Sequence, residues 1–306
     1  MFDNRSSFFI VGAPRCGTTA LSKILAAHPQ VCFSRPKETH FFVRDDLPPL
    51  DPAYLQAEFV APHFPHLSAE HTTFGEGSVS SLYSAEAIDR IRTFDPEARF
   101  IVTIRNPVDM VYSYHGRLLF LLDEDQRDFA RAWALQDDRA AGRALPKSCR
   151  DPRLLHYAEV ATLAPHVERL FDVAGRDRCH VVIFDDLAAN AGQVYETLCG
   201  FLRLTAAPPA KLHQKNQHRT YKNRFLHQFL VNPPPIVVKA LQAARVTPAT
   251  VRRRTKPLRR WLRSKNTQKD VRPPLSADMR RELATFFSAD VSRLGRLLDR
   301  DLSHWH

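Results

Sequence analysis

The feature that most constrains this chain is a glycine-containing turn between a short apolar run and a helical pattern. Residues 8–11 (FFIV) are uniformly apolar, as in a parallel strand buried on both faces. The turn at 12–17 follows, and apolar residues then keep helical spacing from Leu21 to His28, where Pro29 ends the helix. In a strand–turn–helix unit, successive backbone N–H groups face an anion at the positive end of the helix.

Two further apolar runs, at 99–104 and 180–184, also have the character of buried strands. Helical patterns lie at 154–171, 194–204 and 276–298, and Asn106 with Pro107 forms a helix start of N-cap plus first helical residue. This alternation predicts an α/β, P-loop-like, three-layer fold with a central parallel β-sheet flanked by helices. We expect a single domain over 1–306, with anionic ligands beyond the carboxyl ends of the strands.

Composition narrows the choice of partner and compartment. The net charge of +11 favours anionic partners, which include phosphorylated cofactors, acidic glycans, nucleic acid and anionic membranes. The five cysteines are scattered without C-x-x-C spacing, which predicts neither a zinc site nor a disulfide scaffold. Neither a signal peptide nor a membrane-spanning run is apparent, so we expect a cytoplasmic protein.

A basic, proline-containing segment at about 233–272 is predicted to be helical. Of all parts of the chain, it gives the least information about function. It begins with three consecutive prolines and carries many of the Arg and Lys residues of the chain. A solvated charged surface is the simplest interpretation; a lid that attracts an acidic acceptor and a peripheral membrane contact are the alternatives.

The turn at 12–19 is similar to a Walker A loop but lacks its lysine. Thr18 stands where Walker A requires lysine, and the cation comes earlier, at Arg15. The Thr18 and Thr19 hydroxyls add hydrogen-bond donors. An earlier cation suits a donor whose 5′-phosphate is the leaving group and which has no γ-phosphate.

Residues 9–21 resemble the 5′-phosphosulfate-binding loop of sulfotransferases that use 3′-phosphoadenosine 5′-phosphosulfate (PAPS), especially bacterial members and the heparan sulfate type of carbohydrate sulfotransferase. Where the heparan enzymes carry lysine, this chain has Arg15, which keeps the charge but does not readily donate a proton. We therefore expect Arg15 to stabilise the leaving phosphate electrostatically. The resemblance implies donor contacts from Arg15, Cys16, Gly17, Thr18, Thr19 and Ala20.

A second anion-binding motif follows the strand at 99–104. Residues 105–114 resemble the family's 3′-phosphate motif, in which the positions of Arg105 and Ser113 bind the 3′-phosphate of PAPS. ATP has no 3′-phosphate, so this motif argues against a kinase. The stretch at 215–224 resembles the region that closes over the adenosine, with Tyr221, Lys222 and Arg224 as candidate contacts.

Residues 35–42 resemble the segment that carries the family's catalytic glutamate. Glu38 matches that position and would take the acceptor's proton; His40 is the rival base. Lys37 is placed to neutralise donor oxygens, whereas Phe41 and Phe42 are expected in the core.

Residues 75–83 resemble the family's G-E-x-[ST]-P-x-Y region near the acceptor, which makes Glu76 and Ser78 candidate substrate contacts. Gly77 stands where heparan enzymes carry lysine, and the proline is absent, which argues against a heparan-type acceptor.

Together these motifs predict a PAPS-dependent sulfotransferase that needs no metal and releases adenosine 3′,5′-bisphosphate. The acceptor hydroxyl or amine belongs to a small molecule, a glycan or a lipid, with a carbohydrate or a lipid-linked sugar among the candidates, and nucleic acid is not expected. Two alternatives stay open: a P-loop ATP-dependent small-molecule kinase, and a non-catalytic nucleotide- or anion-binding protein.

Overall fold

The computed structural model of the chain describes residues 5–205, 219–223, 226, 261–262, 264–269 and 272–305. They fall into two compact units. Unit 1 comprises Met1–Met110, Val160–Asn216 and Arg280–His306, and unit 2 comprises Val111–Glu159 and Gln217–Met279. The candidate Arg224 lies outside the described residues, as does most of the basic segment. The single domain over 1–306 stays a prediction.

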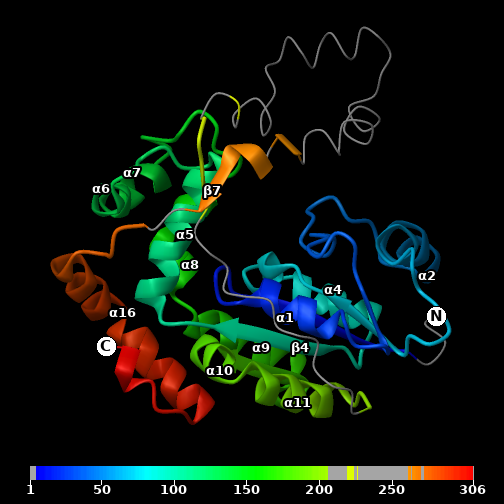
Figure 1. Ribbon diagram of the computed structural model, residues 1–306. Helices are drawn as coiled ribbons and strands as arrows, with labels where there is room; N and C mark the ends of the chain where they lie inside the picture. Colours follow the sequence, from blue (N-terminus) through cyan, green and yellow to red (C-terminus); the bar gives the residue numbers. More distant parts are fainter. Residues whose placement is uncertain are drawn as a thin grey trace, which may run out of the picture. The chain divides into compact units, whose positions relative to one another are not determined.

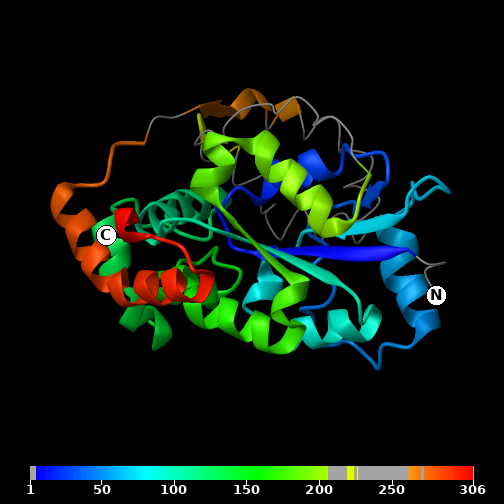
Figure 2. The same ribbon diagram turned by 90° about the horizontal axis from the view of Figure 1, so that it is seen from below.

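Unit 1 is built on a five-stranded parallel sheet with strand order β2-β3-β1-β4-β5. β1 lies in the middle, paired with β3 on one side and β4 on the other (Figure 2). The parallel arrangement confirms the predicted α/β fold. The strands are β1 Ser6–Gly12, β2 Val31–Phe33, β3 Thr73–Glu76, β4 Arg99–Ile104 and β5 Cys179–Ile183.

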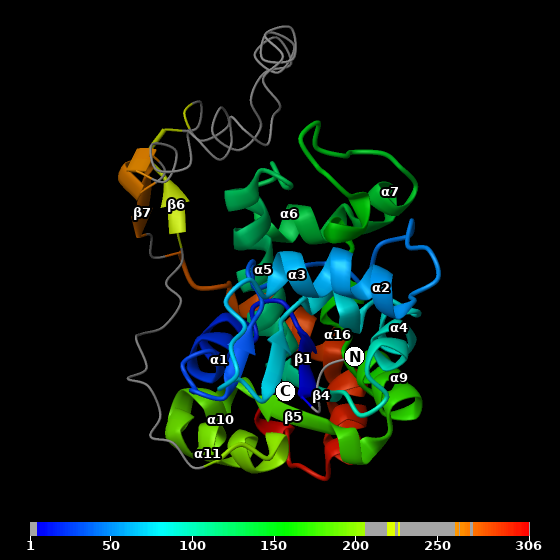
Figure 3. The same ribbon diagram turned by 90° about the vertical axis from the view of Figure 1, so that its right-hand side faces the viewer.

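Helices cover both faces of this sheet, which explains why its strands are almost continuously apolar. On one face, Phe8 and Ile10 of β1 pack in a core with α1 (Thr18–Leu25), α10 (Phe184–Ala189) and α11 (Ala191–Leu202). In Figure 3 these three helices lie on one side of β1, β4 and β5, and α4 (Ala87–Phe94) and α9 (Ala164–Ala174) lie on the other.

Aromatic side chains fill the second face. Phe9 of β1 contacts Phe42, Phe94 and Phe100 edge-on or tilted, with ring centroids 5.7–6.2 Å apart. Phe59 joins the same cluster from the segment Gln56–Val60, between the short helices α2 (Pro52–Leu55) and α3 (Ala61–His63). The cluster anchors the chain that leads away from β2.

The sequence prediction of one helix over 154–171 is wrong. The structure has a single 3₁₀ turn at Pro152–Leu155, then α8 (Tyr157–Ala161), and only then α9. The break is stabilised because Asp290 accepts hydrogen bonds from the backbone N–H groups of Leu163 and Ala164, both at 2.9 Å. These N–H groups at the start of α9 thus find a carboxylate from a distant helix.

The C-terminal residues of unit 1 hold the ends of two strands. α16 (Ala277–Leu298) is followed by a short 3₁₀ turn at Ser303–Trp305. The indole of Trp305 donates to Asp185 at 2.8 Å, just beyond β5, and its carbonyl accepts from Asn106 at 3.3 Å, just beyond β4. The C-terminal turn therefore has a structural role.

Unit 2 contains most of α5 (Pro107–Leu121), which starts in unit 1, with α6 (Phe129–Ala134), α7 (Gln136–Ala140) and the start of α8 (Figure 1). Asn106 caps α5 by accepting from the Val108 N–H, as predicted. A buried ion pair between Glu124 and Arg139 holds the unit together, and Tyr157 donates to the same carboxylate.

Two short strands near the ends of the basic stretch pair with each other. β6 (Arg219–Tyr221) pairs antiparallel with β7 (Thr267–Lys269), and the buried Asn266 accepts from the backbone N–H groups of Lys222 and Asn223. Of the helices in the described part of the chain, none is both long and apolar enough to cross a membrane.

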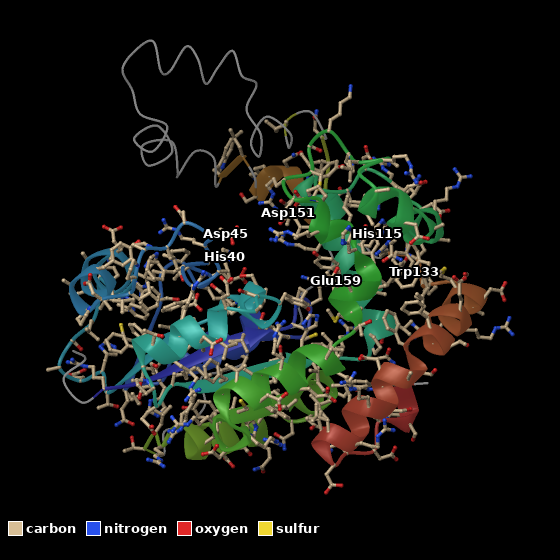
Figure 4. The ribbon with its side chains drawn as sticks, turned by 180° about the vertical axis from the view of Figure 1, so that it is seen from behind. His40, Asp45, His115, Trp133, Asp151 and Glu159 are labelled. Carbon is tan, nitrogen blue, oxygen red and sulfur yellow. The ribbon has the colours of Figure 1, made fainter. Side chains whose placement is uncertain are left out.

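His115 on α5 is a buried titratable group of unit 2 (Figure 4). Its Nε2 donates to the Gln126 carbonyl at 2.8 Å, because Nδ1 accepts from the Arg272 guanidinium at 2.5 Å. Burial, and then the Arg272 charge, lower the pKa of His115 to about 4. Nearby Glu124 acts in the opposite direction, and Arg139 in the same one.

We expect unit 2 to lose stability as the pH falls from about 6.5 towards 4. Between these pH values His115 binds a proton in the unfolded chain but not in the folded unit. This lowers the free energy of unfolding by up to about 3 kcal/mol. Urea unfolding of the wild type and His115→Gln from about pH 7 to 4.5 tests this, because glutamine does not titrate. Equal pH dependence of the two unfolding free energies would contradict it.

Candidate active site

The loop after β1 is held against the neighbouring strand β4. The Ala13 N–H donates to the Thr103 carbonyl at 2.7 Å, and the Thr103 hydroxyl donates to the Gly12 carbonyl at 2.6 Å. The start of the loop is therefore fixed to the sheet by two short hydrogen bonds. From there the chain reaches the first residue of α1 within five residues.

Gly17 forms the N-cap of α1 in a conformation that other residues rarely adopt. Its φ is +90°, and a Cβ placed on it would come within 2.9 Å of Leu187 and 3.1 Å of Phe184. Gly17 offers no side chain to cap the helix. The first N–H groups of α1 have no acceptor within the helix, so this end is suited to an external anion.

Cys16 fills the inside of the turn. Its side chain is fully buried, and the thiol donates to the Pro14 carbonyl at 3.5 Å. Burial raises the pKa of Cys16 to about 12, although Arg105 and Arg15 act in the opposite direction. The thiol is therefore protonated at neutral pH and serves as a small packing group.

Arg105 brings a cation from the end of β4 to the same loop. Its Nη1 donates to the Arg15 carbonyl at 3.5 Å, and its guanidinium lies 4.5 Å from the centroid of the Phe184 ring. Asp109 lies 4.0 Å away but is engaged more closely by Arg280, at 2.8 Å. Arg105 is thus held beside the loop without a tight carboxylate partner.

The segment that carries Glu38 lies between β2 and α2. It contacts the end of the loop after β1, where α1 begins, through Lys37. Lys37 Nζ lies 2.6 Å from Glu38 Oε1 and 3.4 Å from the Thr18 hydroxyl. His40 Nε2 is 3.6 Å from the other Glu38 oxygen, and Figure 4 shows His40 on this segment. Phe41 and Phe42 are buried, as predicted. The Glu38 side chain, 37% exposed, is accessible to a substrate.

Glu76 and Ser78 lie directly behind this segment. Both are 2% exposed, and their polar groups bond to the backbone of Thr39 and His40. The structure therefore connects them with the Glu38 segment and gives them little surface of their own. A direct contact between either residue and a substrate stays a prediction.

The structure thus groups Arg15, Thr18, Lys37, Glu38 and Arg105 within unit 1. Of the other predicted donor contacts, Thr19 is exposed and Ala20 half-buried at the start of α1. Ser113, Tyr221 and Lys222 belong to unit 2. Their contribution to the donor site stays a prediction.

Sequence reasoning missed Phe184. Its ring lies against both Gly17 and Arg105, so it connects the two segments that were predicted to bind anions. The sequence analysis placed it at the end of a strand, whereas in the structure it begins α10. The only signal was its position before Asp185, at the carboxyl end of an apolar run. Within the residues described here, there is no cluster of three metal-ligating side chains.

A family model described as "Sulfotransferase domain" matches residues 5–225 of the chain. Carbohydrate sulfotransferase 15 of Rattus norvegicus is 33% identical over 35% of this chain and 26% of its own length. The bifunctional heparan sulfate N-deacetylase/N-sulfotransferase 3 of Homo sapiens is 29% identical over 37% of this chain and 13% of its own. The chain therefore spans about a quarter or less of these relatives.

A solved structure gives broader coverage. The sulfotransferase from Alicyclobacillus acidocaldarius superimposes with a TM-score of 0.66 and 25% identity, over 98% of both chains. The similarity supports the P-loop-like sulfotransferase fold for the parallel sheet and its flanking helices.

The shape of the anion loop predicts the effect of Gly17→Ala. Alanine adds a methyl group where Leu187 and Phe184 leave no space, in a left-handed conformation that costs about 1–2 kcal/mol. We expect a lower thermal midpoint and at least about tenfold weaker binding of adenosine 3′,5′-bisphosphate by calorimetry. Gly142→Ala is the matched control, because Gly142 has a φ of +76° and open space around its Cβ position. Unchanged affinity in Gly17→Ala would contradict the prediction, because it would show that the loop accommodates a Cβ at position 17.

Proposed function

The chain belongs to the sulfotransferase family, and from that premise we propose that it transfers a sulfuryl group from PAPS to a hydroxyl or amino group of a carbohydrate. The observation that carries the proposal is the contact between Arg105 and the loop after β1. It brings two cationic segments together, and PAPS carries two separate phosphate-bearing groups.

The residues of unit 1 fit such a donor. The N-terminus of α1 and Arg15 supply a positive end and a cation for the 5′-phosphosulfate. Arg105, whose planar guanidinium suits bidentate contact with phosphate, supports recognition of the 3′-phosphate. Lys37 adds a third positive charge beside Thr18.

Glu38 is the proposed general base. It removes the acceptor proton while the acceptor oxygen or nitrogen forms a bond to sulfur and the bond from sulfur to the 5′-phosphate oxygen breaks. Arg15 and the first N–H groups of α1 stabilise the negative charge that develops on the leaving phosphate. Lys37 holds Glu38 close to the donor loop. The released nucleotide is adenosine 3′,5′-bisphosphate.

A carbohydrate acceptor is supported by the names of two relatives and by charge. Of the 44 Lys and Arg residues, 17 lie between Thr197 and Lys269, a stretch without a single Asp or Glu. The rest of the chain consequently has a net charge of −6. A strongly basic stretch of this kind favours an acidic glycan over a neutral one.

The alternatives are less well supported. A kinase would need the Walker A lysine, and this chain has Thr18 at that position. A non-catalytic anion-binding protein would not explain why Glu38 lies 2.6 Å from a lysine that also reaches the donor loop.

Donor recognition is tested by calorimetry without magnesium. We expect the protein to prefer adenosine 3′,5′-bisphosphate over ADP by at least about tenfold, and Arg105→Ala to abolish that preference, because Arg105 would lose its charge-assisted bonds to phosphate. Arg92→Ala is the control, since Arg92 is an exposed cation of the same unit that donates to the Val173 carbonyl at 2.7 Å. Equal affinity for ADP in the wild type would return the kinase to consideration.

Turnover tests the base. With ³⁵S-labelled PAPS and a panel of acidic and neutral polysaccharides, we expect Glu38→Gln to lower kcat by about 10²–10⁴-fold with donor affinity within about twofold of wild type. Glu58→Gln, an exposed carboxylate on a neighbouring segment, is the matched control. A larger loss in His40→Ala than in Glu38→Gln would assign the base to His40.

A further inference from the structure

We propose that Glu76 and Ser78 form a buried brace that fixes the position of Glu38, so that both are positioning residues for the transfer reaction. The inference rests on the proposed role of Glu38 as the base. It concerns how a partly exposed segment without helix or strand structure can hold a catalytic carboxylate in place.

The Glu76 carboxylate is committed to hydrogen bonds with its surroundings. Its Oε1 accepts from the Thr39 N–H at 2.9 Å, the Thr39 hydroxyl at 3.1 Å and the Ser78 hydroxyl at 2.5 Å. Its Oε2 accepts from the Ser78 N–H at 2.9 Å. Four donors meet one carboxylate that is 2% exposed. A carboxylate with several donors is a strong, directional anchor for the backbone that supplies them.

Ser78 extends the brace by one residue. Its hydroxyl donates to Glu76 and accepts from the His40 N–H at 2.8 Å. The Phe41 N–H then donates to the Thr39 hydroxyl at 3.2 Å. Three consecutive backbone N–H groups after Glu38 are therefore satisfied, directly or through one hydroxyl, by the Glu76 carboxylate.

The conformation that the brace holds is one that the chain would not adopt alone. His40 has a φ of +52°, in the left-handed region that residues with a side chain seldom occupy. Such a conformation persists where the surrounding structure determines it from several sides. Here the N–H of His40 is held by Ser78, and its ring contacts the Ser80 hydroxyl at 2.8 Å.

The residue before Glu38 is held by the same strand end. The Lys37 carbonyl accepts from the Gly77 N–H and from the Ser34 hydroxyl, both at 3.0 Å. Glu38 is thus fixed at the preceding carbonyl and at the following N–H by residues 76–78. The Glu38 side chain, which contacts Lys37, stays accessible to a substrate.

Sheet pairing does not need this carboxylate. Glu76 ends β3 and pairs with Phe9 through the backbone, which any residue could do. A buried carboxylate at this position is costly unless its hydrogen bonds are kept. Among the described residues, the Glu76 side chain bonds only to Ser78 and to the segment that carries Glu38.

Glu76→Gln is the sharpest variant, because it keeps the shape and replaces one oxygen by an N–H₂ group. In either orientation that group would face a donor from Thr39 or Ser78. We expect kcat to fall by about 10–100-fold, since a displacement near 1 Å can have an effect of this size. The affinity for adenosine 3′,5′-bisphosphate should stay within about twofold. Ser78→Ala should have the same signature with a smaller loss.

A double-mutant cycle separates positioning from general damage. If the brace acts through Glu38, the double variant Glu38→Gln/Glu76→Gln should have a kcat within about threefold of that of Glu38→Gln alone. Asp290→Asn is the matched control: its oxygens also accept two backbone N–H groups in unit 1, and we expect a lower thermal midpoint with unchanged kcat.

The outcomes distinguish the brace from the proposed function. Two results would contradict the brace while leaving the proposed function intact, provided that the wild type transfers the sulfuryl group. One is a kcat of Glu76→Gln within twofold of wild type. The other is a double variant in which the kcat losses of Glu76→Gln and Glu38→Gln multiply. If the wild type transfers to no acceptor, the function fails, and amide hydrogen exchange decides on the brace. Exchange at Thr39 and His40 that is at least about tenfold faster in Glu76→Gln supports it, and unchanged exchange overturns it.

Discussion

The parallel pairing of β1 with both β3 and β4 is the constraint on which the site depends. Because all three strands run in the same direction, their carboxyl ends reach the same edge of the sheet. β1 delivers the anion loop there, β4 delivers Arg105, and β3 delivers Glu76. The pairing also supplies the hydrogen bonds between Thr103 and the start of the loop. A change in register would separate the cations from the loop that they serve.

Charge is used in two ways in this molecule. Arg15, Lys37, Glu38 and Arg105 keep part of their surface and are available to charged ligands. Glu76 is buried and fully engaged, as is the pair of Glu124 and Arg139 in unit 2, where the removal of either partner would leave a buried charge without compensation. The first group performs the proposed chemistry. The second fixes the backbone, and its effect on catalysis is through geometry.

Much of the fold could be predicted from the sequence because the signals are local. Apolar runs marked β1, β4 and β5, and Asn106 with Pro107 marked the start of α5. The exceptions depend on contacts between residues far apart in the chain. Asp290 divides the predicted helix from about 127 residues away, and its partners Leu163 and Ala164 carry no signal of that contact.

The same distinction holds for the site. The loop with Arg15, the Glu38 segment and Arg105 have sequence motifs, and the structure brings them together. Phe184 has none, and the motif that contains Glu76 and Ser78 does not indicate a brace, since the packing of a ring on Gly17 or the burial of Glu76 becomes visible only in three dimensions. Glu76 was predicted as a substrate contact because its segment resembles a family region near the acceptor, and that resemblance does not reveal that its side chain is 2% exposed.

The absence of a side chain at Gly77 makes room for Lys37. The family resemblance places lysine at this position, whereas glycine carries no charge. In this chain the side chain of Lys37 lies in that space, and a Cβ on Gly77 would come within 3.1 Å of it. Lys37 reaches both Thr18 and Glu38 from there. The positive charge beside the donor loop is therefore supplied by the segment of the proposed base, and a side chain at position 77 would compete with it for the same space.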